Sequence, residues 1–573
     1  MSTPKFNPAI LAISWACAFA AVVMVNVAAV SAQDRTQDAA DSLQGRERIV
    51  HLLSRVTFGP TKKLVDEVEK AGLESWLAAQ FELPRLDFVT AERLSRFASL
   101  GLSSNDVYDK YVLRKEGAPS RRGELSNELT GSVFVRATYN SQQVGEVMSD
   151  FWRNHFNVDR SKDSVFWTAV EYDRIVLRDR VFGSFRDMLL ASAQHPAMLV
   201  YLDNHISRRP PNKTELKSVA RKVRRATGSR ERGEEAAQIA SQRGLNENYA
   251  RELLELHTLG VDRGYTQKDV IAVAEIFTGW TVDTLENRYT FSFDENMHVH
   301  GDKFLLGKTV PRQKLRHGTK EGLLVLDRLA RHPLTATFLA EKLCRYLVSD
   351  EPPPVLVKTT AAKLRSSDMN LGTAVKHIVA SDEFYRPRHY RSKFKTPLEF
   401  VISALRVTSA NIVKIAALRR TLEGMGQPIY NCEDPTGYRD TAESWRDPGV
   451  MVGRWRFALD LVRNRIPGVE VPETLFIHLK NKNRHAMIAS LAKEVLPGGM
   501  REETLRFCID ASRRYDRIQR EKAEAKAMGK KPSKGKKNPK DEKKKRKPLA
   551  DRFDGIERFL LGVLIGSPEF QEQ

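Results

Sequence analysis

Apolar residues recur at helical spacing along most of the 573-residue chain. The i, i+3, i+4, i+7 pattern marks one face of an amphipathic helix. Only the segment Arg288–Leu306 differs, because its aromatic residues alternate with polar ones in the way that predicts a strand or hairpin. The pattern therefore predicts a mainly α fold, a multi-helical globular body with one short β-hairpin-like segment. The helical pattern is met at Ile49/Leu52/Leu53/Val56, Val144/Val147/Met148/Phe151, Ala336/Leu339/Ala340/Leu343 and Leu398/Val401/Ile402/Leu405.

The first residues predict export. Lys5 precedes a charge-free, mostly apolar run, Phe6–Gln33, in which Val30, Ser31 and Ala32 form a small-residue ending. A basic start, an apolar middle and such an ending describe a secretory signal peptide over residues 1–32. The same run is also long enough to span a bilayer as an uncleaved anchor, and this alternative stays open. In either case we expect the rest of the chain in the periplasm, at the cell surface or outside the cell.

The net charge of +21 is concentrated in two segments. Arg208–Arg243 holds 11 basic and four acidic residues, and Arg513–Lys547 holds 17 and five. The remaining chain is nearly balanced, so it lacks the basic face of a nucleic-acid-binding protein, and we expect no specific nucleic acid as partner.

Both basic segments are expected to be disordered additions to the body, most clearly Gly529–Pro548, because they have little apolar surface to bury. In an exported protein, flexible polycations bind anionic envelope polymers, lipid headgroups or extracellular nucleic acid without specificity, through counterion release. The alternative is that these segments only keep the protein soluble.

Changes in composition divide the chain into six regions. We expect a leader at 1–32, an N-terminal helical region at 33–125, a central helical region at 126–343 with the basic insertion 208–243, a C-terminal helical region at 344–512, a basic and partly disordered segment at 513–548, and a C-terminal helix at 549–573. Besides Cys17 in the leader, the cysteines are Cys344, Cys432 and Cys508, too few for a disulfide framework or a zinc cluster. One pair could form a bridge, and the sequence does not choose which.

The densest polar cluster is Asn246–His257. On a helix, Asn248, Arg251, Glu252 and Glu255 lie on one stripe. The two carboxylates could hold a metal ion or divide acid and base roles. The alternative, which we favour because structural ion pairs outnumber catalytic dyads, is an ion pair between Arg251 and Glu255 on an ordinary helix face. His257, at the end of the segment, is expected to be a core histidine.

A second candidate is His155, which shares the apolar face of its predicted helix with Met148 and Phe151. A buried imidazole needs a hydrogen-bond partner, which we expect from the Asn246–His257 segment or from Asp203 and its neighbour Asn204. If these groups meet in a cleft between helices, the candidate catalytic residues are His155, Asp203, Glu252 and Glu255. A purely structural role stays open for each of them.

A third candidate is a metal site formed by His298, His300 and Asp302. In an extended chain these alternate residues point to one side, where two imidazoles and a carboxylate could bind a divalent cation. The alternative is a pair of exposed loop histidines. The sequence indicates no other cofactor.

Short motifs follow one another along the chain in a characteristic order. They are Arg55–Thr61, Phe151–Phe156, Pro196–Asn204, Asn246–Gly260, Gly264–Gln267, Phe277–Thr281, His332-Pro333, Lys395–Glu399, Met425–Pro428 and Trp445. This series resembles a bacterial family catalogued as a domain of unknown function, family 1800, over about Ile49–Phe570. The resemblance implies a mostly helical, exported protein without an established activity.

The family resemblance also implies a partner. Members tend to be encoded beside a second exported family similar to phosphatases and sulfatases, so a partnership in the periplasm or at the cell surface is expected. This chain departs from the family pattern in two places. The segment Arg208–Arg243 looks like an insertion, and Val299 stands where an Asp commonly follows the histidine, which weakens the metal interpretation of His298.

Two functions of different classes follow. The first is a non-catalytic exported protein that assembles with a partner enzyme or with the cell envelope. The alternative is a metal-assisted hydrolase with a site between the central helices.

Overall fold

The computed structural model describes residues 42–82, 86–113, 119–241, 244–285, 288–479, 482–527 and 555–573. The predicted leader, and with it Cys17, lies outside the described residues, as does Gly529–Pro548. Within the described part the fold is mainly α, as predicted, and its strands form three two-stranded antiparallel sheets. None of the described helices has the length and apolar character needed to cross a bilayer.

The N-terminal helices confirm the apolar pattern. In the first helix Leu52, Leu53 and Val56 are buried and Ile49 packs against the core, and in α8 all four patterned residues are buried. The elements are α2 (Gly45–Val56), α3 (Lys62–Ala71), α4 (Leu73–Gln80), α5 (Phe88–Ser95), α6 (Ser104–Val107), the π-helix η1 (Tyr108–Val112), α7 (Arg122–Tyr139) and α8 (Gln143–His155).

The central part continues with helices and two further π-helical turns, η2 and η4. Its elements are α9 (Val165–Tyr172), η2 (Asp173–Arg178), α10 (Phe185–Gln194), α11 (Pro196–Tyr201), η3 (Asn204–Ile206), α12 (Lys213–Thr227), α13 (Arg230–Ser241), α14 (Asn248–Glu252), η4 (Leu253–Thr258), α15 (Gln267–Phe277), η6 (Leu315–His317), α16 (Thr319–Ala330) and α17 (Pro333–Leu347).

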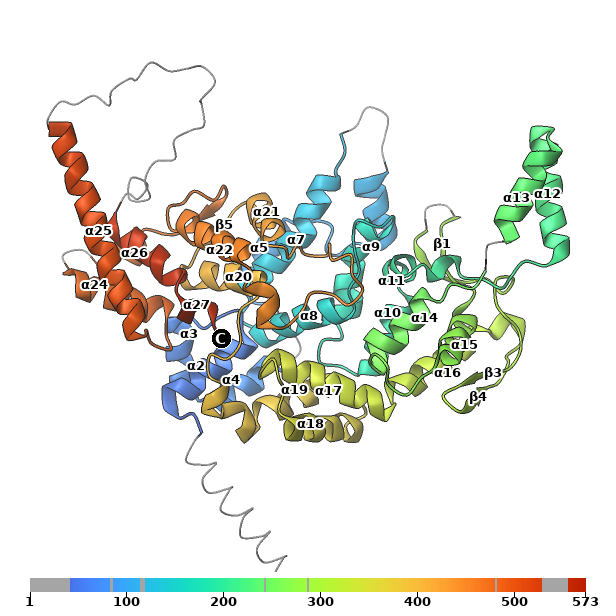
Figure 1. Cartoon of the computed structure of the whole chain (residues 1–573), viewed down its shortest axis with the longest axis horizontal. Coiled ribbons are helices and arrows are strands. Elements are labelled where there is room, and N and C mark those ends of the chain that lie inside the picture. Colours follow the sequence, from blue (N-terminus) through green and yellow to red (C-terminus); the bar gives the residue numbers. More distant parts are fainter. Residues whose placement is uncertain are drawn as a thin grey trace, which may run out of the picture.

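The C-terminal part packs back onto the N-terminal helices (Figure 1). Its elements are α18 (Pro354–Ser366), α19 (Leu371–Val379), η7 (Asp382–Tyr385), η8 (Pro387–His389), α20 (Pro397–Val407), α21 (Ala416–Gly424), η9 (Ala442–Trp445), α22 (Pro448–Leu461), α23 (Thr474–Ile477), α24 (Arg484–Val495), α25 (Glu502–Ala527), α26 (Ile556–Ile565) and α27 (Pro568–Gln571).

The predicted strand segment Arg288–Leu306 does contain strands, but they pair with strands outside it. The strand β1 (Trp280–Asp283) pairs with β2 (Thr290–Phe293), and β3 (Lys303–Leu305) pairs with β4 (Lys308–Val310). A third pair joins β5 (Asn411–Ile412) to β6 (Val469–Glu470). Residues 294–302 form the turn between β2 and β3, so the histidine motif is not on a strand.

One hydrophobic cluster runs from the N-terminal to the C-terminal helices. The region boundaries drawn from composition stay a prediction, and those at 125–126, 343–344 and 512–513 fall inside α7, α17 and α25. The cysteines Cys344, Cys432 and Cys508 are all buried and free.

The basic insertion is ordered, which differs from the predicted disorder. It folds as a helical hairpin of α12 and α13, and the helix α25 likewise continues past Arg513 to Ala527. Local signals explain the hairpin: Asn212 and Glu215 form a capping box, and Gly228 ends α12 in the left-handed conformation. A Cβ at Gly233 would lie 2.6 Å from the carbonyl oxygen of Ala220, so glycine permits the close packing of the two helices.

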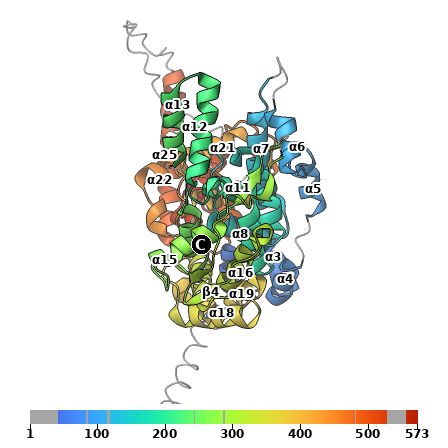
Figure 2. The same cartoon turned by 90° about the vertical axis from the view of Figure 1, so that its right-hand side faces the viewer.

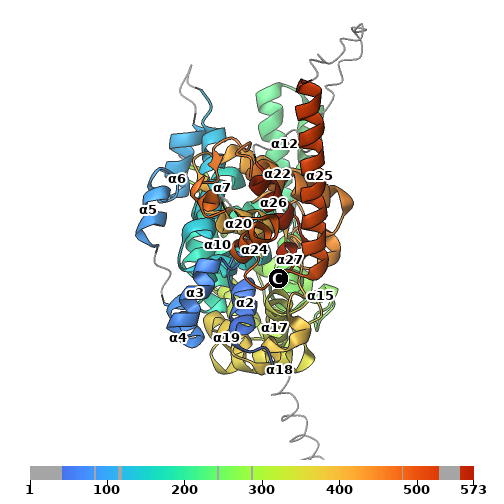
Figure 3. The same ribbon diagram turned by 90° about the vertical axis from the view of Figure 1, so that its left-hand side faces the viewer.

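The hairpin and α25 stand at opposite ends of the body's long axis (Figure 1). Both project from the body in the same direction, which is visible from either end of the molecule (Figures 2 and 3).

Candidate binding pocket

A pocket lies where the end of α8 meets the start of α20 and the loop that follows α21. We call it the motif pocket, because its lining includes residues from three of the sequence motifs, Phe151–Phe156, Lys395–Glu399 and Met425–Pro428. Its cavity volume is about 40 Å³, room for a few water molecules or one small side chain. It is lined by Asp150, Phe151, Arg153, Asn154, Asn157, Tyr346, Thr396, Leu398, Gln427, Ile429, Tyr430, Tyr438, Arg439 and Asp440.

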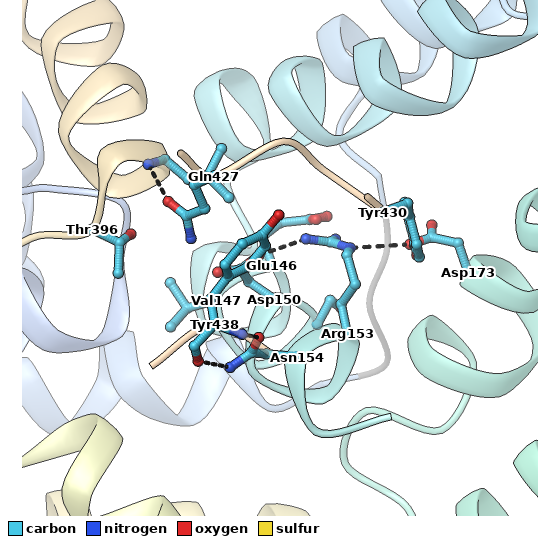
Figure 4. A network of polar contacts seen from close by, with 12 residues as sticks. Glu146, Val147, Asp150, Arg153, Asn154, Asp173, Thr396, Gln427, Tyr430 and Tyr438 are labelled. Carbon is cyan, nitrogen blue, oxygen red and sulfur yellow. Dashed lines mark hydrogen bonds and ion pairs between the residues drawn. The ribbon is translucent and has the colours of Figure 1, made fainter. Parts of the chain in front are cut away.

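The loop of residues 425–445, which we call the pocket loop, forms one wall of the pocket. Asn154 fixes it to α8 (Figure 4). The side-chain Nδ2 of Asn154 donates to the carbonyl oxygen of Tyr438 at 2.6 Å, and the backbone N–H of Tyr438 donates to Oδ1 at 2.6 Å. Gly437 has φ +75°, and a Cβ there would lie 2.5 Å from Asn154 Oδ1. This close approach requires glycine at position 437.

Further hydrogen bonds hold the loop at both ends. The backbone N–H of Leu398 donates to Gln427 Oε1 at 2.8 Å. Buried Lys393 donates from Nζ to Asp350 Oδ1 at 2.7 Å and to the carbonyl oxygen of Asp440 at 3.2 Å. Arg439 is exposed, so the loop side of the pocket reaches solvent.

A network of charged side chains extends from the pocket lining into the buried part of the protein. Arg153 Nη1 lies 2.5 Å from Asp150 Oδ1, and Arg153 Nε lies 3.7 Å from Asp173 Oδ1. Arg178 joins Asp173 and Glu146 with distances of 2.6 Å to each. Because each buried charge faces an opposite charge, the network is compensated within the protein.

Burial and the neighbouring charges together shift the pKa values of the carboxyl groups at the pocket in different directions. Burial raises the pKa of Asp150 to about 6, against the opposing effect of Arg153. Burial also raises the pKa of Asp440, which Lys342 and Lys393 oppose. At Asp173 burial is outweighed by Arg178 and Arg153, which lower its pKa to about 2, and the hydroxyl of Tyr430 donates to this carboxylate.

The motifs that meet at the pocket belong to a family whose model matches residues 51–572, described as "Protein of unknown function (DUF1800)". The chain is a member of the DUF1800 family. No curated protein and no solved structure matches it.

The DUF1800 motif Phe151–Phe156 also contains the predicted site residue His155, which does not line the pocket. His155 is buried, and its ring packs against Phe156 at 4.6 Å between centroids. Its Nε2 lies 3.3 Å from the carbonyl oxygen of His257, so the hydrogen-bond partner comes from the expected segment, but from its backbone. Burial lowers the pKa of His155 well below its ordinary value, which keeps the imidazole neutral.

The DUF1800 segment that contains Glu252 and Glu255 forms α14 and η4. Arg251 lies 3.4 Å from Glu255, which confirms the predicted ion pair. Glu252 is half-buried, and burial together with the charge of Glu255 raises its pKa to about 7. Asp203 instead pairs with Lys162 at 2.7 Å, in a left-handed backbone conformation with φ +59°. Buried His257 has a pKa lowered by burial to about 3.

The residues of the predicted metal site have separate partners. The Nδ1 of buried His298 donates to the carbonyl oxygen of Thr278 at 2.9 Å, and its Nε2 lies 3.4 Å from Glu321. His300 is exposed, and Asp302 accepts a hydrogen bond from the backbone of Arg312. Across the described ranges there is no group of three His, Cys, Asp or Glu side chains that could hold a metal ion.

The sequence pointed to part of the pocket but did not bring its pieces together. The motif Met425–Pro428 marks the start of the pocket loop, and Lys395–Glu399 marks the start of α20. Asp173 and Tyr430, which complete the charge network, lie outside the sequence motifs. The contact between Asn154 and Tyr438 joins residues 284 positions apart, which no local pattern predicts.

Proposed function

We propose that the chain is an exported, non-catalytic binding protein of the cell envelope whose motif pocket receives a side chain of an exported partner protein. The observation that carries this proposal is the construction of the pocket. It is formed by three family motifs around aromatic and amide side chains, next to charges that compensate one another. A preformed pocket with apolar walls and a few placed polar groups is suited to recognition.

The state of the candidate catalytic residues also supports binding over catalysis. His155 is enclosed by aromatic rings and donates to a backbone carbonyl group, while Asp203 and Glu255 are each ion-paired. Groups engaged in this way stabilise the fold and are not poised for proton transfer.

The partner we propose is an exported protein similar to phosphatases and sulfatases, as the family resemblance implies. The polar groups at the rim of the pocket suit a peptide segment. Exposed Arg439 offers a positive charge, and Gln427 is an amide among the lining residues. We place the complex in the periplasm or at the cell surface, held at the membrane if the leader is retained.

The proposal is tested by titrating the purified chain with the phosphatase-like or sulfatase-like exported protein of the same bacterium, by isothermal calorimetry. R439Q should weaken the complex at least about tenfold, which corresponds to ~1.4 kcal/mol. The matched control is R312Q, which alters an exposed arginine in the loop between β4 and η6 and should leave the affinity unchanged. Equal affinities for the native chain, R439Q and R312Q would show that the pocket does not bind this partner.

A second candidate function is metal-assisted hydrolysis at Glu252. One observation favours it: a carboxyl group with a pKa of about 7 lies beside Glu255 and is affected by the charge of Asp434. A general acid or base operates best at such a pKa. Elemental analysis of the purified protein separates the two functions. Stoichiometric zinc, manganese or calcium that is lost in E252A or H298A would favour the hydrolase over the binding protein.

A further inference from the structure

The two projecting basic elements form what we call the basic arms. The hairpin arm is α12 and α13, residues 213–241, and the helix arm is the part of α25 from Arg513 to Ala527. Their helical structure gives the positive charges fixed positions relative to the body.

The hairpin arm carries a basic stripe along α12. Lys213, Lys217, Arg221 and Arg225 follow one another at intervals of four residues, so they lie along one side of the helix, and all four are exposed. Lys222 and Arg224 add two more exposed charges beside them. The only acidic residue of α12 is Glu215, which forms an ion pair with Arg209.

The helix arm is anchored at its base and exposed beyond it. Cys508 and Tyr515 of α25 are buried in the core, and Ile518 packs against it one turn further along. Arg514, Arg517 and Arg520 are exposed at intervals of three residues. The acidic Asp516 is occupied by an ion pair with Arg484.

We infer that the two basic arms together bind one extended anionic polymer. The arms project in the same direction from opposite ends of the body, so a single long chain can contact both (Figures 1–3). Simultaneous contact raises the affinity because the second arm binds at a high effective concentration.

The positions of the charges favour a polymer over a lipid surface. The stripe on α12 runs along the length of the helix, about 20 Å at 1.5 Å per residue, where a polymer can lie alongside it. A flat bilayer would contact only the tip of the hairpin around Gly228. Residues 224–232 at that tip contain no large apolar side chain that could insert into lipid.

The experiment measures binding of fluorescently labelled inorganic polyphosphate to the purified full-length chain. One probe is short, about 20 Å long, and reaches a single arm; the other is several times longer than the body. The long polyphosphate should bind to the protein at least about tenfold more tightly than the short one. Neutralising either arm, with K217Q/R221Q/R225Q or with R514Q/R517Q/R520Q, should remove most of this advantage. Each triple variant should also reduce the slope of log affinity against log salt by about 2 to 3.

The matched control is K358Q/K363Q/R365Q on α18, which removes three exposed charges from the opposite side of the body (Figure 1). It should leave the affinity ratio of long to short polyphosphate unchanged. If the α18 variant lowers this ratio as much as the two arm variants do, or if the native protein binds long and short polyphosphate equally well, the inference is overturned. Binding to phosphatidylglycerol vesicles through the same residues, with no binding of polyphosphate, would also overturn it. Because no partner protein is present, this result is independent of the function proposed for the pocket.

Discussion

Asp150 is a buried residue of the pocket lining whose ionisation makes the stability of the protein depend on pH. Its carboxylate pairs with Arg153, yet burial still raises its pKa to about 6. Asp173, a neighbour in the same network, has its pKa lowered to about 2 because two arginines face it. Arg153 and Arg178 lower the pKa of both groups. The two differ because Asp173 also accepts hydrogen bonds from Arg178 and Tyr430, whereas the negative charges of Glu399 and Asp440 raise the pKa of Asp150.

The raised pKa of Asp150 predicts a pH-dependent stability. Between about pH 4 and pH 6 the folded protein binds more protons at this residue than the unfolded chain does, so its contribution to the free energy of unfolding falls as pH rises. D150N cannot ionise. Relative to the native protein it should therefore gain up to ~3 kcal/mol between about pH 4 and pH 7, measured by urea unfolding. D187N, at an exposed position of α10, is the control. If the free energy of unfolding of D150N follows that of the native chain in parallel across this pH range, the prediction is contradicted.

Arg178 compensates two buried carboxylates, so its loss should be costly. R178M leaves Asp173 and Glu146 without their shared cation and should lower the free energy of unfolding by ~3–5 kcal/mol. R174M alters a half-exposed arginine of the same π-helical segment and should cost less than ~1 kcal/mol. Denaturant unfolding near neutral pH compares the two variants. Similar costs at both positions would mean that the buried network contributes little.

At the scale of elements, the π-helical turn η2 decides which residues meet. Its i→i+5 geometry places Arg178 beside Asp173, five positions earlier, with 2.6 Å between Nε and Oδ2. In a regular α-helix, neighbours on one face are three or four residues apart. The widened turn thus creates an ion pair that helical periodicity does not predict.

The pocket loop depends on one glycine. G437A adds a Cβ against Asn154 and strains a left-handed backbone, so we expect the loop to move away from α8 and the pocket to lose its partner. G426A imposes the same kind of backbone strain, ~1–2 kcal/mol, in open space. Hydrogen exchange of residues 425–445, with calorimetric titration of the partner, compares the two. Equal protection of the loop in both variants would show that the contact with Asn154 is unimportant.

At the scale of the whole molecule, helices of the N-terminal, central and C-terminal parts share one core, although composition suggests several regions. The pocket itself combines residues from α8, from Tyr346 on α17 and from the loop after α21. Such a site exists only when distant parts of the chain are packed together.

The shared core predicts that a large fragment does not fold alone. A chain of residues 42–343 ends inside α17 and lacks the helices that cover its core. We expect it to give no sharp thermal transition and a weak near-ultraviolet circular dichroism signal, whereas residues 42–573 give both. A cooperative transition of the fragment would instead support an independent domain that ends near residue 343.

Local patterns predicted what depends on near neighbours. The apolar positions of α8, α17 and α20 are buried as expected, because helical periodicity selects the face that packs. The ion pair between Arg251 and Glu255 was also predictable, since its partners are one helical turn apart. The hairpin arm was missed because the prediction rested on its low apolar content and gave no weight to the capping box at Asn212, which is a local signal. The close contact at Gly233 arises only once the two helices pair.

By itself the sequence determined the helical class, the family and the location of the charge, because composition, periodicity and motif order are properties of the chain in one dimension. Only the tertiary structure decided that three motifs line one pocket, that Asp150 and Asp173 ionise differently, and that the basic arms project in the same direction. The physical reason is distance along the chain. Contacts such as that of Asn154 with Tyr438, and the burial that shifts a pKa, arise only when segments far apart in sequence pack together.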